Sequence, residues 1–302
     1  ALGGVMAGLC RGMAPFSSKE WAKNIYDRLL NRLDFIAPEK KKIEVFLGIA
    51  DGLKNLQDKS LLRDYYSKLI PFVERFINRR EKALGFRRLA RGFQEINDLT
   101  LAGKMWERCI SIASSLDDEK SHELKTDILA EALITIWGLE DSAWQTQAAQ
   151  QVYESLKGLS PVVLPEFVRK VFAGVQNIKY AEFQANVIEN VCIIIENLEE
   201  PGDIIRCISS ISTGISGLPK GALLKQILDR TVKIINKLKQ GTIKVQAMAI
   251  ISSNFLKVGI RDWAVQSYSS IDKAYKKLKD QNLKSVLFSE MFMIPFHSTD
   301  AK

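Results

Sequence analysis

Residues 86–93 read FRRLARGF, and this stretch decides the fold because its spacing returns along the chain. In it the apolar Leu89 is followed by the small Ala90 and, three places on, by Phe93. The same apolar, small, apolar triplet recurs every forty residues on both sides, with one insertion of two residues after the fourth copy. The copies are Leu9-Cys10-Met13, Ile49-Ala50-Leu53, Leu89-Ala90-Phe93, Leu129-Ala130-Leu133, Val171-Phe172-Val175, Ile211-Ser212-Ile215 and Ile251-Ser252-Phe255. Such a period indicates stacked copies of one supersecondary unit.

A second apolar series follows each triplet in the same phase. In the third copy it reads Ala102, Trp106, Cys109 and Ala113, a spacing of three and four that is typical of one helical face. Breakers and N-cap candidates, among them Asp58 and Asp98, separate the two halves of a copy. Each unit is therefore predicted to be a helix, a short turn, a second helix and another short turn.

We predict an all-α solenoid of about seven helix-turn-helix repeats and a C-terminal half repeat, forming one domain over residues 1–302. The expected repeats are 3–42, 43–82, 83–122, 123–164, 165–204, 205–244 and 245–284, with a terminal helix at 285–296. Pro71 falls inside a predicted second helix and is expected to kink it. The apolar stretch 1–10 is in register with the first helix of the first repeat, so we interpret it as structure rather than as a signal peptide.

The third unit resembles the tetratricopeptide repeat (TPR) family in its order of large, small and aromatic positions. These positions are Phe86, Leu89, Ala90 and Phe93 on the first helix and Ala102, Trp106 and Cys109 on the second. The likeness covers residues 3–284, although that family has a period of about 34 residues, and a HEAT-like or private repeat is the alternative. The resemblance implies a right-handed α-α superhelix whose first helices line a concave surface that binds peptides or protein segments, with no shared catalytic activity.

The residues offer no enzyme signature. The four cysteines lie within the apolar periodicity, which favours free buried thiols, and neither His122 nor His297 neighbours a nucleophile or metal-ligand partner. We therefore expect no catalytic residue, no cofactor and no metal. No apolar stretch reaches the roughly 18 residues of a membrane span, and the cysteine usage suits a reducing, cytoplasmic setting.

The net charge of +8 is unevenly distributed. Residues 1–116 carry 21 Lys and Arg against 13 Asp and Glu, residues 117–204 carry 6 against 16, and residues 205–284 carry 15 against 4. Such segregation sets up a field that can steer and orient an associating partner.

One solvent-facing position of successive first helices reads Arg11, Asp51, Arg91 and Glu131. Alternating signs at this position can form an ion-pair ladder between neighbouring helices or a polar groove floor that recognises a ligand. For the groove we predict five basic partner-binding residues, because the planar fork of arginine suits carboxylates. They are Arg11, Lys54, Arg87, Arg91 and Arg169, and the expected ligand is an acidic or carboxylate-bearing protein segment.

Small residues replace charges on the later first helices. They include Ser209, Ser210, Ser212, Thr213, Ser252 and Ser253. These residues either let helices approach closely or form a shallow trough for a partner.

Our leading hypothesis is a non-catalytic protein–protein interaction scaffold or adaptor that binds a partner segment on the concave surface. The alternative is a nucleic-acid-binding helical repeat protein that uses its basic end blocks. The acidic middle block and the lack of a repeated base-stacking pair count against that alternative. The apolar terminal helix, with Leu287, Phe288 and Met291, offers a surface for self-association.

Overall fold

A computed structural model shows an all-α protein, with no strand among the residues it describes. These residues are 19–53, 56, 58–139, 142–219, 221–238 and 241–257, together with the isolated positions 8, 276, 281, 284 and 285. The predicted all-α class is confirmed. The terminal helix expected at 285–296 and the first helix expected within 3–42 lie outside this range, apart from Gly8 and Ser285.

Contacts divide the chain into two compact units. Unit 1 comprises residues 1–132 and 139–152, and unit 2 comprises residues 133–138 and 153–302. The helices of the first part are α2 (Lys19–Leu33), α3 (Glu39–Leu53), α4 (Lys59–Glu74), α5 (Arg79–Glu95) and α6 (Leu99–Ser114). The boundary between the units passes through α7 (His122–Thr135), which follows the short 3-10 helix η1 (Glu119–Ser121), and through α8 (Ser142–Lys157), which follows η2 (Ile136–Gly138).

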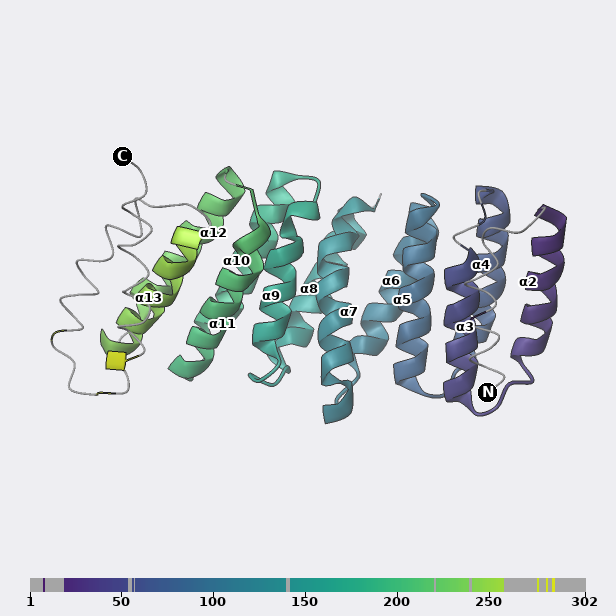
Figure 1. Ribbon diagram of the computed structural model, residues 1–302, viewed down its shortest axis with the longest axis horizontal. Coiled ribbons are helices and arrows are strands. Elements are labelled where there is room, and N and C mark those ends of the chain that lie inside the picture. The colour runs from purple at the N-terminus through teal and green to yellow at the C-terminus, as the bar shows by residue number, and fades with distance from the viewer. Residues whose placement is uncertain are drawn as a thin grey trace. The chain divides into compact units, whose positions relative to one another are not determined.

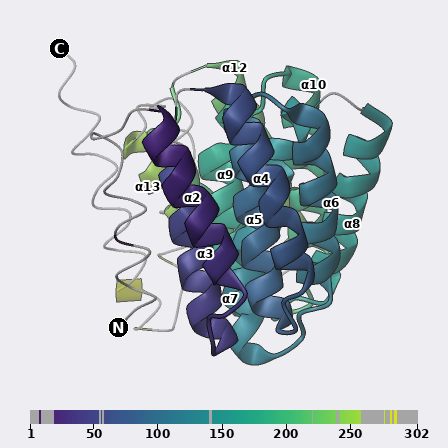
Figure 2. The ribbon, with the colours of Figure 1, turned by 90° about the vertical axis from the view of Figure 1, so that its right-hand side faces the viewer.

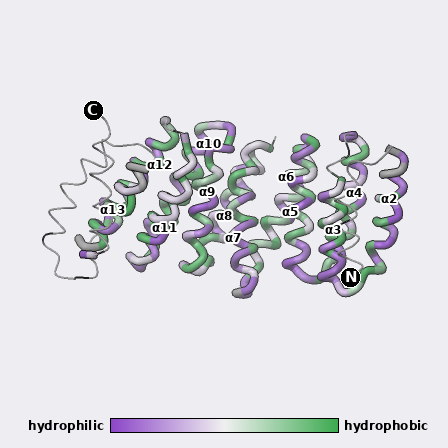
Figure 3. Tube along the Cα trace, in the orientation of Figure 1, coloured by the Kyte–Doolittle hydropathy of each residue, from purple (hydrophilic) through white to green (hydrophobic). Residues whose placement is uncertain are grey.

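Among its described residues, unit 2 continues with five α-helices and two 3-10 turns. They are α9 (Leu164–Gly174), η3 (Val175–Asn177), α10 (Ala181–Glu196), α11 (Pro201–Gly214), η4 (Ile215–Gly217), α12 (Ala222–Lys237) and α13 (Gly241–Lys257). Hydrophilic and hydrophobic residues alternate along these helices and those of unit 1 (Figure 3). The alternation is that of helices with one buried face.

Several helices begin earlier than the expected repeats. The first helices α3, α5, α11 and α13 start four residues before the predicted starts at 43, 83, 205 and 245. Local capping explains two of these differences: Asn78 caps α5 by accepting a hydrogen bond from the Arg80 amide at 2.8 Å, and Pro201 is the first residue of α11. Pro201 therefore opens this helix.

Side-chain caps start the second helices of unit 1 as the sequence predicts. Asp58 accepts a hydrogen bond from the Leu61 amide at 3.0 Å, and Asp98 accepts one from the Leu101 amide at 3.1 Å. Pro71 lies near the end of α4, which stops three residues later at Glu74. Its missing N–H therefore affects only the last turn.

Neighbouring helices pack in the way that a repeat array requires. In unit 1, α3 contacts both α4 and the equivalent helix α5 of the next pair, and α5 contacts α6 (Figures 1 and 2). In unit 2, α9 contacts α11, α11 contacts α13, and α10 contacts α12 (Figure 1). Within each unit, first helices thus stack on first helices, and in unit 2 second helices also stack on second helices.

The repeated triplet forms the core of both units. Every member of the series whose exposure the structure describes is buried: Ile49, Ala50, Leu53, Leu89, Ala90, Phe93, Leu129, Ala130, Leu133, Val171, Phe172, Val175, Ile211, Ser212, Ile215, Ile251 and Ser252. The aromatic positions of the second helices, Tyr26, Tyr66 and Trp106, are buried with them. The predicted phase of the repeat is therefore confirmed for the residues that the structure describes.

Close helix approach explains the small residues of α11. A Cβ atom added to Gly214 would lie 2.7 Å from the backbone oxygen of Arg169 on α9 and 3.0 Å from the Cβ of Phe172. Ser212 on the same helix is fully buried. Packing, not a trough open to a partner, accounts for these two positions.

Replacing Trp106 by alanine should lower the free energy of unfolding by about 3–5 kcal/mol, the range for large aromatic truncations in cores. Trp106 is fully buried, and its indole N–H donates to Gln94 Oε1 at 3.3 Å. Urea denaturation of Trp106→Ala measures this loss. The neighbouring exposed residue supplies the control, because Glu107→Ala should change the value by no more than about 0.5 kcal/mol. Equal denaturation midpoints for the two variants would contradict the burial of Trp106.

Gly214→Ala should destabilise the protein by about 1–3 kcal/mol, because overpacking must push α9 and α11 apart. Gly202 in the same helix has no atom within 4 Å of the position of an added Cβ. Gly202→Ala should therefore be neutral or stabilise the fold by up to about 1 kcal/mol through helix propensity. The melting temperatures of the two variants test this prediction. A melting temperature of Gly214→Ala above that of the unaltered chain would mean that α9 and α11 are not in this close contact.

Candidate partner-binding surfaces

Two of the predicted basic residues share one carboxylate inside unit 1. Arg91 on α5 makes a two-pronged contact with Glu131 on α7, donating from Nε to Oε1 and from Nη2 to Oε2, the latter at 2.5 Å. Arg87, one turn earlier, donates from Nε to Glu131 Oε2 at 2.6 Å. The ladder interpretation is thus confirmed for the step from Arg91 to Glu131.

Burial distinguishes the two arginines. The side chains of Arg87 and Glu131 are 19% and 17% exposed, whereas that of Arg91 is 45% exposed. The hydrogen bond to Glu131 is the main influence that raises the pKa of Arg91, so the guanidinium stays charged. Arg87 and Glu131 therefore belong mainly to the helix contact, and Arg91 keeps part of its surface for solvent or a ligand.

Asp51 is paired differently from the simple ladder. It accepts a hydrogen bond from Arg88 Nε at 2.8 Å, and Arg88 Nη2 donates to the backbone oxygen of Ala50 at 2.8 Å. Arg88 is buried, and its guanidinium lies 5.9 Å from the centre of the Tyr66 ring. These contacts of Arg88 join α3 and α5. They could not be predicted from the sequence, because Arg88 lies next to the packing position Leu89 and arginine does not recur at the equivalent position of other copies.

Arg169, the third described member of the predicted site, lies on α9 in unit 2. It forms a two-pronged pair with Glu166 of its own helix, at 2.8 Å from Nε and 2.6 Å from Nη2. This hydrogen bonding lowers the pKa of Glu166 to about 2. Arg11 and Lys54, the two remaining members, lie outside the described residues.

The described cysteines have the character of buried packing residues. Cys109, Cys192 and Cys207 are free and buried, and burial raises the pKa of Cys192 and of Cys207 to about 12 and shifts that of Cys109 in the same direction. Thiols of this kind are not nucleophilic at neutral pH. In the part of the chain that the structure describes, no three His, Cys, Asp or Glu residues gather as a metal site would require. No helix among the described residues is long and apolar enough to cross a membrane.

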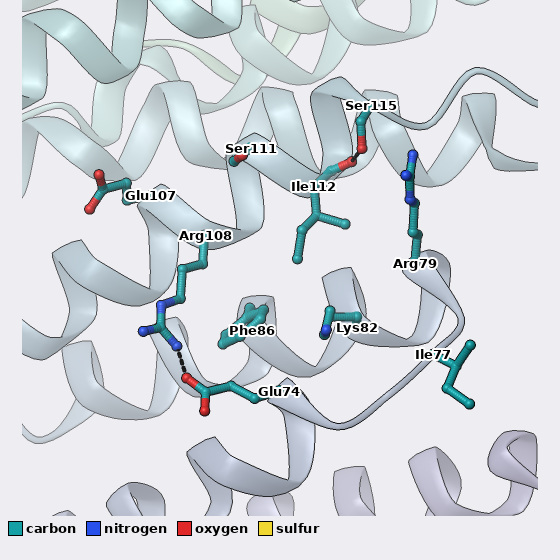
Figure 4. Close-up of a pocket in the computed structure, with 10 residues that line it drawn as sticks. All are labelled: Glu74, Ile77, Arg79, Lys82, Phe86, Glu107, Arg108, Ser111, Ile112 and Ser115. Carbon is teal, nitrogen blue, oxygen red and sulfur yellow. Dashed lines mark hydrogen bonds and ion pairs between the residues drawn. The ribbon is translucent and has the colours of Figure 1, made fainter.

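A pocket of 770 Å³ opens at one end of α5 and α6 in unit 1 (Figure 4). Its walls come from the end of α4, the following turn, the first half of α5 and the second half of α6. The lining residues are Glu74, Ile77, Arg79, Lys82, Phe86, Glu107, Arg108, Ser111, Ile112 and Ser115. Sequence reasoning did not find this pocket, because its members come from three helices and a turn and share no periodic position.

The basic residues that line the pocket differ in whether they form an ion pair with another residue of the chain. Arg108 binds Glu74 and lies 5.5 Å from the centre of the Phe86 ring, so its charge is compensated within the chain. Figure 4 places this pair at one end of the pocket and Arg79 at the other, with Lys82 between Phe86 and Ile77. The second end is therefore the basic one.

Glu131→Ala should reduce stability by about 1–3 kcal/mol, because it leaves the largely buried Arg87 without its carboxylate. Arg91→Ala should cost only about 0.5 kcal/mol, since its pair is half exposed. Chemical denaturation of both variants tests the assignment. If Arg91→Ala proves the more costly change, the structural role belongs to Arg91 and not to Arg87.

No protein-family model matches the chain, and no curated protein matches it.

Proposed function

We propose that this protein is a non-catalytic interaction scaffold that binds a segment of a protein partner on its helical surface. The observation that carries the proposal is the contrast between repeated and variable positions. The triplets and the second-helix aromatics are buried and repeat, whereas the exposed positions between them carry charges that differ from copy to copy. A stack of helix pairs thus offers a large surface whose chemistry varies without disturbing the core.

The ligand class follows from the charge of unit 1. Residues 1–116 carry an excess of Lys and Arg, and arginine binds carboxylates through paired hydrogen bonds. The exposed part of Arg91 belongs to this basic surface, although its charge is shared with Glu131. An acidic protein segment is the partner that this balance favours.

Cross-linking of the purified full chain in an extract of its source cells tests the scaffold function. Mass spectrometry should identify peptides of one or a few partner proteins joined repeatedly to the same lysines of the chain. A parallel titration with single-stranded RNA and duplex DNA should give only weak, salt-sensitive retardation in a gel.

Tight nucleic-acid binding that persists at about 0.2 M salt would contradict the proposal and favour the alternative. Cross-links scattered over many abundant proteins, with no recurrent partner, would also contradict it. A matched control is the Trp106→Ala variant, whose damaged core should remove the specific cross-links while leaving scattered ones.

A further inference from the structure

The α5–α6 pocket contains two cations that have no partner in the part of the chain that the structure describes. Arg79 and Lys82 line its basic end, and neither side chain has an ion-pair or hydrogen-bond partner among the described residues. This contrasts with Arg87, Arg91 and Arg169, each of which is held by a carboxylate of the chain. Unpaired cations beside a concave wall are the groups best placed to bind an external carboxylate.

Apolar surface lies next to these cations. Ile77, in the turn before α5, is 89% exposed, so most of its apolar surface is in contact with water. Phe86 forms a buried part of the lining, and Ile112 on α6 is half-buried (Figure 4). A bound apolar side chain would therefore cover surface that is now in contact with water.

The repeat itself does not require these residues. Forty positions earlier, Ile77, Arg79 and Lys82 correspond to Ala37, Glu39 and Lys42, and forty positions later to Asp117, Glu119 and His122. Among these three copies, only residues 77–82 combine an isoleucine with two cations at these positions, so the packing of the repeat does not depend on this combination.

The hollow also continues beyond this end. A second hollow of 460 Å³ shares Arg79 and Ser115 with the pocket and is also lined by Arg80, Lys120, Asp117 and Asp118. Its lining is therefore of mixed charge, and the basic residue that it has in common with the pocket is Arg79.

We propose that the α5–α6 pocket is the docking site for an acidic, apolar linear segment of a partner protein. The carboxylate of the segment lies between Arg79 and Lys82, and a neighbouring apolar side chain packs against Ile77 and Ile112. The proposal rests on the scaffold function and assigns its binding site. A nucleic-acid strand fits less well, because Glu107 lines the opposite end of the same pocket and a continuous polyanion would place a phosphate beside it.

Fluorescence anisotropy with the full chain tests this site. The probe is a short fluorescein-labelled peptide of alternating glutamate and leucine, compared with one in which glutamine replaces glutamate and one in which serine replaces leucine. Binding should require both features, and the affinity should fall with salt, because part of it is ionic.

The variant Arg79→Gln/Lys82→Gln should weaken binding of the glutamate–leucine peptide about tenfold, since it removes two ion pairs. Ile77→Ser should weaken it several-fold, and its exposure means that the fold should tolerate the change. The matched control is Lys23→Gln/Arg28→Gln, which removes one lysine and one arginine from exposed positions of α2 in the same unit. Its affinity should stay within about twofold of the unaltered chain.

Three results would overturn the proposal. The first is an equal loss in the control variant, which would reduce the effect to net charge. The second is an unchanged affinity in Arg79→Gln/Lys82→Gln together with a loss in Arg87→Gln/Arg91→Gln, which would move the site to the first-helix surface. The third is no binding of the glutamate–leucine peptide; this would remove the pocket as a docking site while the cross-linking experiment tests the scaffold function independently.

Discussion

Small residues where two helices come close together are the constraint on which the packing of the described helices depends. Where the small residue is Ala50, a second helix can come close enough for the Tyr66 hydroxyl to donate to the Ala50 backbone oxygen at 3.3 Å. Where α11 crosses α9, Gly214 leaves no room for even a methyl group. Each such contact fixes the distance between neighbouring helices, and the apolar residues on either side then fill the space between them.

The sequence predicted which residues are buried better than it predicted which charged side chains form ion pairs. Periodicity predicted the all-α class, the buried aromatics and the caps at Asp58 and Asp98, because each of these follows from local spacing. The helix starts at Glu39 and Pro201 were missed by four residues, since a proline can open a helix as well as end one. The predicted ladder was correct for Arg91 and Glu131, but Asp51 pairs with Arg88, whose position has no periodic signal.

Charge pairing inside the chain explains why the predicted basic site is only partly available. Glu131 occupies Arg87 and Arg91, and Glu166 occupies Arg169, so a ligand carboxylate would have to compete with groups that are already in place. An arginine held in this way strengthens a helix contact or a helix turn, and its displacement has a cost that a weak ligand does not recover. Counting cations along the sequence cannot distinguish such residues from free ones, because the distinction depends on which carboxylate lies within reach in three dimensions.

In this repeat, the positions that stabilise the fold differ from those that are available to bind a partner. A change at Trp106 or Gly214 affects packing throughout a helix pair, so the sequence can vary little there. The turn at residues 75–78 joins two helices and contributes only Phe76 to the core. Neither Ile77 nor the adjoining Arg79 recurs in the two neighbouring copies, which have Ala37 and Glu39, and Asp117 and Glu119. Since a partner can be distinguished only by positions that differ between copies, specificity in this architecture is expected at the turns and helix ends. The pocket beside Ile77 combines an exposed apolar side chain with unpaired charge at such a place, and it is there that the surface departs most from what the fold alone needs.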